Sequence, residues 1–149
     1  MTKGRAWLLR SGIVLLLVVA VPLVGKWLRR HDGPRCAVDG LVIDPLYRVR
    51  VVDGAGHSYS FCCVQCARRW WRRHADEPAE VFVTDETSAT EMPADSAYFV
   101  DSTVITNPVT NNSIHVFRQR ADAEVHARTF AGELLTDADR PFAREKKSP

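Results

Sequence analysis

Four cysteines stand at two places in the 149-residue chain, and three of them are almost contiguous. Cys36 lies in the segment CAVDGLVI, and Cys62, Cys63 and Cys66 lie in the segment FCCVQC. Thiolates are the ligands that soft and borderline ions such as Cu(I) and Zn(II) prefer. A Cys-x-x-Cys pair at the start of a helix places both sulfurs on the first turn, where the helix dipole favours the thiolate form. The spacing therefore predicts a metal site built from Cys36, Cys62, Cys63 and Cys66.

Three other interpretations of these cysteines stay open. Free cysteines are often buried as small apolar side chains, and a structural zinc site uses the same residue types. Cys63 and Cys66 are also spaced as a redox disulfide, although no thioredoxin-like pattern precedes them. If Cys62 and Cys63 both belong to a strand, their side chains point to opposite faces. In that case one of the two is the ligand, and we favour Cys63 as the partner of Cys66.

Few other residues are candidate ligands. Asp39 is either a hard fourth ligand for zinc or a turn residue before Gly40, and we favour the turn. His57 in a predicted turn and His74 at the end of a predicted helix are candidates to complete the site, but isolated histidines at such positions are more often solvated. The sequence contains no Ser-His-Asp context, phosphate-binding loop or His-Glu-x-x-His motif, so no enzyme activity is predicted.

Basic residues are unevenly distributed. Residues 1–35 hold seven of the 20 Lys and Arg and one of the 18 Asp and Glu, which leaves 13 basic and 17 acidic residues in the remainder. A mildly acidic body is a poor partner for phosphate backbones, so no nucleic-acid binding is predicted. The run Arg68, Arg69, Arg72 and Arg73 is either a solvated helix face or a surface that stabilises thiolates or docks an acidic partner.

The elements that must position the cysteines follow from hydrophobic periodicity. Alternation over residues 47–53 and 59–62, with Gly54-Ala55-Gly56-His57 between them, predicts a β-hairpin. A helix at 64–74 and a strand at 81–84 complete a first set. The second set repeats this order with strands at 97–100, 113–118 and 132–135 and a helix at 121–130. The predicted fold class is therefore α+β, with an N-terminal transmembrane helix followed by a small domain of two ββαβ-like units.

An uncharged run from Ser11 to Gly25 predicts that transmembrane helix, with Trp7 and Trp27 near the two interfaces. A cleaved signal peptide is the alternative, but no small-x-small cleavage site follows the run. The charges on its two flanks do not decide the orientation. The predicted order is a membrane anchor at 1–30, a linker at 31–35, a metal-binding domain at 36–136 with units at 36–85 and 97–136, and a charged flexible tail at 137–149.

Four short motifs follow one another along the chain: Val81-Phe82-Val83-Thr84-Asp85, Ala97-Tyr98-Phe99-Val100, Thr106-Asn107-Pro108-Val109 and Gly132-Glu133-Leu134-Leu135. Their order resembles the NosL family of copper accessory proteins. The segment Tyr59-Ser60-Phe61-Cys62-Cys63, with Cys66, is similar to the YHS/TRASH class of metal-binding modules. Together these resemblances cover roughly residues 36–136.

The departures from the NosL pattern concern the metal ligands. The family's second cysteine falls on Asp39, and its two methionines fall on Leu41 and Val109, so Cys36 alone carries over as a ligand. Thiolates in place of thioethers bind Cu(I) more tightly and admit zinc more readily.

The resemblance implies a membrane-anchored Cu(I) chaperone that delivers metal to a recipient metalloenzyme or metal carrier, in the manner of a nitrous oxide reductase accessory protein. The alternatives are a structural Zn(II)-binding interaction module and a thiol redox protein. We expect a single-pass protein of the bacterial inner membrane, with its domain on the periplasmic or extracytoplasmic side.

Overall fold

The structure is a computed structural model that describes residues 33–74, 76–77, 79–136 and 139–143. The described residues from Pro34 onward belong to one compact domain. The predicted membrane anchor at 1–30 lies outside the described residues. Within the described part of the chain, both α-helices are ten residues long, and neither is long and apolar enough to cross a membrane.

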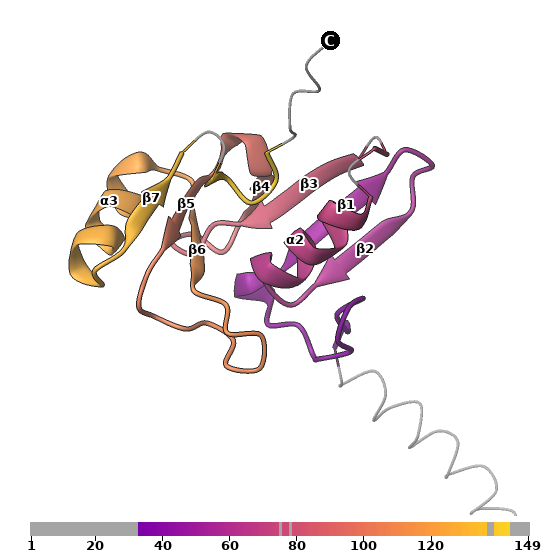
Figure 1. The fold of residues 1–149 in the computed structure, drawn as a ribbon, viewed down its shortest axis with the longest axis horizontal. Coiled ribbons are helices and arrows are strands. Elements are labelled where there is room, and N and C mark those ends of the chain that lie inside the picture. Colours follow the sequence, from indigo (N-terminus) through magenta and orange to yellow (C-terminus); the bar gives the residue numbers. More distant parts are fainter. Residues whose placement is uncertain (1–32, 75, 78, 137–138, 144–149) are drawn as a thin grey trace, which may run out of the picture. The chain divides into compact units, whose positions relative to one another are not determined.

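A hairpin, a helix and a returning strand form the first ββαβ unit (Figure 1). Its elements are β1 (Val49–Asp53), β2 (Ser58–Phe61), α2 (Val64–Arg73) and β3 (Ala79–Thr84). A short strand, β4 (Glu91–Pro93), extends the antiparallel sheet to the order β2-β1-β3-β4. Val49 and Val51 are buried whereas Arg50 between them is partly exposed, which is the alternation expected of a half-buried strand.

The second ββαβ unit has the same order of elements. It consists of β5 (Tyr98–Asp101), β6 (Ile114–Phe117), α3 (Arg120–Thr129) and β7 (Glu133–Leu135). Its sheet has the order β6-β5-β7, so in both units the first strand lies between the other two. The predicted α+β class and the predicted strands and helices are confirmed, with ends that shift by one or two residues. The sequence did not predict β4 or the two 3-10 helices, η1 (Pro45–Tyr47) and η2 (Ala94–Ser96).

Asp85 and Glu86, which follow β3, join the two units. An Asp85 carboxylate oxygen accepts from the backbone N–H of Arg118 at 2.9 Å, and a Glu86 carboxylate oxygen accepts from that of Val116 at 3.0 Å. Burial by itself raises the pKa of Asp85, but hydrogen bonds from Ser88 and Arg118 outweigh it and hold the pKa below its usual value. The motif that ends in Asp85 therefore marks the joint between the two sheets.

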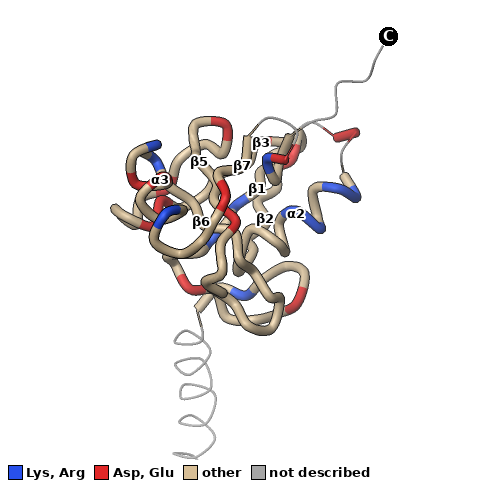
Figure 2. Tube along the Cα trace, turned by 60° about the vertical axis from the view of Figure 1, so that its left-hand side comes forward, with Lys and Arg blue, Asp and Glu red and all other residues tan. Residues whose placement is uncertain are grey.

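Charged residues are unevenly distributed along the chain of the domain (Figure 2). On the first sheet, Glu91 pairs with Arg50 at 2.6 Å and with Arg48 at 3.4 Å. Basic residues also gather along α2, whose sequence VQCARRWWRR contains no acidic residue. The two regions differ because the arginines of the sheet have a carboxylate partner and those of the helix face solvent.

Residues 139–143, which belong to the segment predicted as a charged flexible tail at 137–149, pack against the domain. The Arg140 guanidinium donates to the carbonyl oxygens of Ala94, Asp95 and Ala97 at 2.8–3.1 Å. The Phe142 ring is buried and packs edge-on against Trp71 and Phe99, with centroids 6.2 and 6.0 Å away. The segment was predicted to be loose because it is mostly charged, but its one aromatic residue, Phe142, packs into the core.

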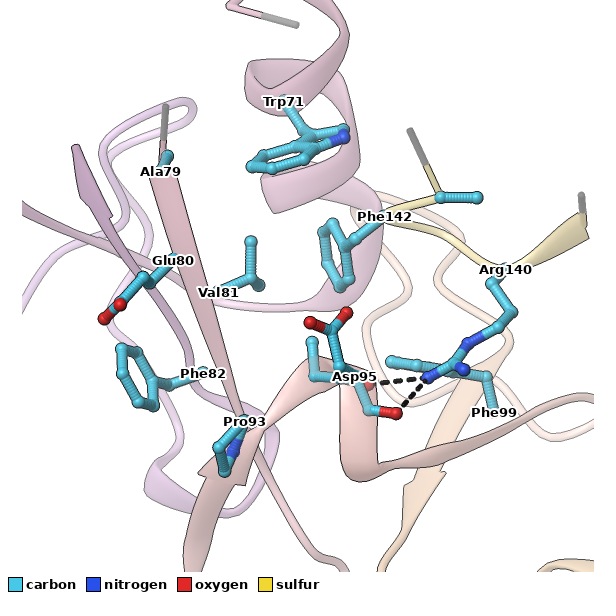
Figure 3. Close-up of a pocket in the computed structure, with 12 residues that line it drawn as sticks. Trp71, Ala79, Glu80, Val81, Phe82, Pro93, Asp95, Phe99, Arg140 and Phe142 are labelled. Carbon is cyan, nitrogen blue, oxygen red and sulfur yellow. Dashed lines mark hydrogen bonds between the residues drawn. The ribbon is translucent and has the colours of Figure 1, made fainter. Parts of the chain in front are cut away.

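Beside these rings lies a cavity of about 700 Å³, bordered by α2, β3, β5 and residues 140–143 (Figure 3). None of the four cysteines lines it.

His115 on β6 is a buried titratable group. Its Nδ1 lies 2.9 Å from a Glu86 carboxylate oxygen and its Nε2 lies 3.1 Å from the Val104 carbonyl oxygen, so the protonated ring donates at both nitrogens. Burial alone lowers the pKa of His115, but the hydrogen bond to Glu86 and its charge raise the pKa above the usual value. The ring of His126 lies 4.2 Å away, and its pKa is lowered by burial and by the charge of His115.

This arrangement predicts a pH-dependent contribution to stability. Because the folded-state pKa of His115 exceeds the unfolded value of about 6.5, its stabilising effect is complete below that pH and is lost as the pH rises through the folded-state pKa. We expect the difference in unfolding free energy between the wild type and His115→Gln to be largest near pH 5.5 and to shrink toward roughly pH 8.5, as measured by urea denaturation. In a Glu86→Gln background the difference should no longer shrink. A difference that grows with pH in the wild-type background would contradict this assignment.

Candidate metal centre

A tight turn brings Cys36 and Asp39 to the same side of the first sheet. The Gly40 N–H donates to the Cys36 carbonyl at 2.9 Å, and the Cys36 N–H donates to the Leu41 carbonyl at 2.8 Å. Gly40 has a φ of +72°, a left-handed conformation that glycine adopts without strain. The Ala37 N–H donates to the Ser60 carbonyl at 2.9 Å, which fixes the turn against β2.

The other cysteines lie where β2 gives way to α2. Phe61 ends the strand, Cys62 occupies a bend and Cys63 is the residue before the first helical turn. Cys66 is the third residue of the helix, so it lies in the first turn, whose backbone N–H groups have no partner within the helix. This junction places the sulfurs of Cys62 and Cys66 3.7 Å apart.

Four ligand atoms meet at this point. The sulfurs of Cys36, Cys62 and Cys66 and a carboxylate oxygen of Asp39 all lie within 4.8 Å of one another. One Asp39 oxygen accepts from the thiols of Cys66 at 3.0 Å and Cys62 at 3.3 Å. The three cysteines are each at most 4% exposed, whereas Asp39 is exposed. The carboxylate therefore marks the side from which solvent reaches the thiols.

The electrostatics of this group favour one negative charge among neutral thiols. Burial alone raises the pKa of Asp39, but hydrogen bonds from Cys66 and the Leu41 N–H hold that pKa below its usual value. The pKa of the Cys62 thiol is raised by burial, and that of Cys66 is raised by its contact with Cys63 and by burial. Binding of a cation reverses this preference, because a coordinating thiol is deprotonated and its proton is released.

Cys63 lies beside the group and outside it. Its sulfur is 3.8 Å from the Cys62 sulfur and 3.3 Å from the Thr110 hydroxyl, and its side chain is fully buried. Contacts with Cys66 and Thr110 lower the pKa of the Cys63 thiol. The structure thus places Cys62 in the group of ligand atoms, whereas the sequence favoured Cys63 as the ligand. The reason is that Cys62 lies in a bend and its side chain points toward Asp39.

Asp39 serves both of the roles that the sequence left open. Its other carboxylate oxygen accepts from the Leu41 N–H at 3.0 Å, which is the turn interaction. The oxygen that faces the thiols is the potential ligand. Asp39 is also the position on which the second cysteine of the NosL pattern falls, so a carboxylate stands where that pattern has sulfur.

The loop from Thr106 to Asn112 covers the sulfurs from the second unit. The Asn107 amide donates to the Cys62 sulfur at 3.4 Å. The Asn112 side-chain oxygen accepts from the Gln65 N–H at 3.1 Å and so caps α2. Sequence reasoning missed Asn107, Thr110 and Asn112, because only the fold brings them into contact with Cys62, Cys63 and Gln65, which are 45 to 47 residues away. The run TNPVTNN was the available signal for a polar turn.

The remaining candidates lie outside the group. His57 contacts Asp53 at 3.1 Å in the hairpin turn, and His74 stacks on Trp70 with a centroid separation of 4.0 Å. Val109, where the NosL pattern has methionine, is 72% exposed and lies two residues after Asn107.

The spacing of the sulfurs suits coordination of one ion. Two sulfurs bound to one zinc at about 2.3 Å, at a tetrahedral angle, lie roughly 3.8 Å apart. The separation of 3.7 Å between Cys62 and Cys66 is close to that value. Three thiolates alone suit Cu(I), and three thiolates with a carboxylate suit Zn(II).

Comparison with solved structures identifies a similar fold. The crystal structure of the copper chaperone NosL from Shewanella denitrificans superposes with a TM-score of 0.62, at 18% sequence identity, over 70% of this chain and 87% of that one. The resemblance to NosL is therefore confirmed at the level of the fold, and the TRASH-like part stays a prediction. No protein-family model and no curated protein matches the sequence.

The geometry predicts different roles for the two adjacent cysteines. Replacement of Cys62 by Ser removes a sulfur from the group, so we expect at least about a 100-fold loss of metal affinity. Replacement of Cys63 by Ser changes a neighbour of the ligands, and we expect a loss of about tenfold. Competition with a chromogenic chelator, for Cu(I) and for Zn(II) under anaerobic conditions, measures both. A larger effect of Cys63→Ser than of Cys62→Ser would show that the sequence preference for Cys63 was right.

Proposed function

We propose that the protein is an accessory protein that binds Cu(I) through Cys36, Cys62 and Cys66 and passes it to a recipient metalloenzyme or metal carrier. One observation carries the proposal. Three buried thiols lie close together, and the carboxylate next to them, that of Asp39, is exposed to solvent. The fold shared with a copper chaperone supports the same class of function.

Transfer proceeds by exchange of thiolates. Cu(I) accepts two or three sulfur ligands, so a recipient cysteine can bind before a donor cysteine leaves. The recipient thiol loses its proton on binding, and the departing donor thiolate takes up a proton. Asp39 already accepts hydrogen bonds from Cys62 and Cys66, so it is placed to receive and return these protons.

Most of the core consists of apolar side chains other than the cysteines. Phe61, Val83 and Phe99 are almost fully buried and come from both sheets, and the four cysteines belong to the same buried cluster. Within the group, hydrogen bonds among the thiols and Asp39 occupy the polar atoms in the absence of metal. We therefore expect the metal-free domain to remain folded, as a carrier requires.

Asp39 is the observation that favours the second candidate, a structural zinc module for protein–protein contact. A carboxylate is a harder ligand than a thiolate and is common around zinc. In that case the free energy of metal binding is part of the free energy of folding, and removal of the metal unfolds the domain.

Anchoring by the membrane helix at residues 11–25 and the periplasmic or extracytoplasmic location are part of this proposal. They rest on the sequence, because that segment lies outside the described residues. Nitrous oxide reductase as the recipient likewise stays a prediction from the resemblance.

Metal analysis combined with circular dichroism tests the proposal. We expect the full-length chain, purified reduced and anaerobically in a non-ionic detergent, to bind about one Cu(I) per chain through thiolates. When a chelator removes the copper, the far-ultraviolet spectrum should remain that of a folded domain, and unfolding should stay cooperative at a lower melting temperature. Tightly held zinc whose removal melts the domain would favour the structural module instead.

A matched pair of variants separates the two candidates further. Asp39→Asn keeps the oxygen that accepts from Leu41 and removes the carboxylate charge. For a three-thiolate Cu(I) site we expect a loss of Cu(I) affinity of about tenfold or less, since Asp39 is then a neighbour of the ligands. For a zinc site with Asp39 as fourth ligand, the loss of Zn(II) affinity should exceed about 100-fold. A large loss for Cu(I) would contradict the three-thiolate assignment.

A further inference from the structure

The solvent face of α2 is almost entirely arginine. Arg69, Arg72 and Arg73 are exposed and Arg68 is partly exposed, while Val64, Ala67 and Trp71 are buried on the opposite face. At about 100° per residue, the four arginines occupy an arc of roughly 140°. Gln65 is the uncharged member of that arc. Figure 2 shows the basic residues along this helix.

Within the described part of the chain, none of these four arginines has an ion-pair partner. By contrast, Arg50 on the first sheet pairs with Glu91, and Arg120 on α3 pairs with Glu124. On α2 the pairs at i,i+4 and i,i+3 carry like charges and repel one another. The helix dipole favours Arg72 and Arg73 in the last turn, but it offers no such compensation to Arg68 and Arg69. The arrangement is thus unfavourable for the isolated domain.

The arginine arc borders the metal group. Arg69 and Arg73 follow Cys66 by three and seven positions, so they lie within about 60° of Cys66 around the helix axis. A surface that contacts these arginines is therefore next to Cys66, on the helix that carries this cysteine.

Resting on the proposed function, we propose that Arg68, Arg69, Arg72 and Arg73 form the docking surface for the metal-exchange partner, and that this partner presents a cluster of carboxylates next to its own metal-binding thiols. The positive face attracts the acidic surface over a distance and aligns it, so encounters occur with the two sets of thiols side by side. The arginines act on docking and leave the metal ligands themselves unchanged.

The surroundings of α2 favour a protein partner over a lipid surface. Asp39 lies at the N-terminal end of the helix, and Asp76 and Glu77 follow its C-terminal end, all three exposed. A flat anionic bilayer in contact with the arginines also approaches these carboxylates, which oppose it. A protein surface with a compact acidic patch can contact the arginines between them.

Transfer to two synthetic acceptors tests the proposal. Both peptides contain Cys-Gly-Gly-Cys, followed by four glutamates in one and by four glutamines in the other. With the copper-loaded full-length chain in a non-ionic detergent, we expect transfer to the glutamate acceptor to be about tenfold faster at low ionic strength. The advantage should disappear at about 0.3 M salt, where charges are screened over a few ångströms.

Two pairs of substitutions locate the effect. Arg69→Gln with Arg73→Gln should abolish the advantage of the glutamate acceptor and leave Cu(I) affinity unchanged. Arg120→Gln with Arg128→Gln, on the exposed face of α3, is the matched control and should retain it. The proposal is wrong if the advantage is absent in the wild type or survives the α2 substitutions.

Binding without metal separates this proposal from the proposed function. Fluorescence anisotropy with the glutamate peptide, its cysteines replaced by serine, reports docking to the metal-free chain. Binding that needs Arg69 and Arg73 supports the surface even if no copper is bound. Copper binding without any such docking supports the function and overturns the surface. Phosphatidylserine-containing micelles and duplex DNA are compared with the peptide at equal concentration of negative charge. If either binds more tightly than the peptide, the proposed docking surface is also overturned.

Discussion

The hydrogen bond from the Gln65 N–H to the Asn112 side chain joins the two units at the start of α2, next to the sulfurs. Cys63 provides no side-chain cap for α2, so the second unit supplies one. The same asparagine donates to the Thr106 hydroxyl at 2.7 Å and to the Ile114 carbonyl at 3.0 Å, and it is 1% exposed. The buried Asn112 amide, with all these hydrogen bonds made, therefore fixes three elements: the start of α2, the loop at 106–112 and strand β6.

This joint explains how repeated units with one order of elements produce a single metal group. The first unit supplies all the sulfurs, and the second supplies the loop that contacts them through Asn107 and Thr110. In the first unit the β2–α2 junction carries cysteines, whereas the equivalent β6–α3 junction carries Arg118 and Gln119. The two units thus share their order of elements, and of these two junctions only the β2–α2 junction of the first unit provides thiols to the metal group.

The sequence predicted the elements well because strands and helices depend on local periodicity, which the chain displays clearly. The spacing of the cysteines also predicted that Cys36 approaches the strand-to-helix junction of Cys62 and Cys66, and these three sulfurs do lie together. The choice between Cys62 and Cys63 depends on a bend after the strand, and the position of Asn112 depends on the packing of distant segments, so neither follows from spacing. Asp39 was assigned to a turn, and only the fold shows that its second carboxylate oxygen contacts the thiols of Cys62 and Cys66. Phe142 was hidden in a charged segment because composition averages over single residues.

Asp39 also connects the electrostatics of the site to its proposed use. A fourth thiolate would increase the negative charge of a Cu(I) complex and hold the metal more firmly, which opposes release. A carboxylate at that position is a weak ligand for Cu(I), accepts hydrogen bonds from the thiols of Cys62 and Cys66, and is exposed. A Cu(I) ion held by the three thiolates would therefore remain accessible to an incoming sulfur on the Asp39 side. The arginines follow Cys66 along α2, so one helix carries both a ligand of the proposed site and the surface proposed to attract its recipient.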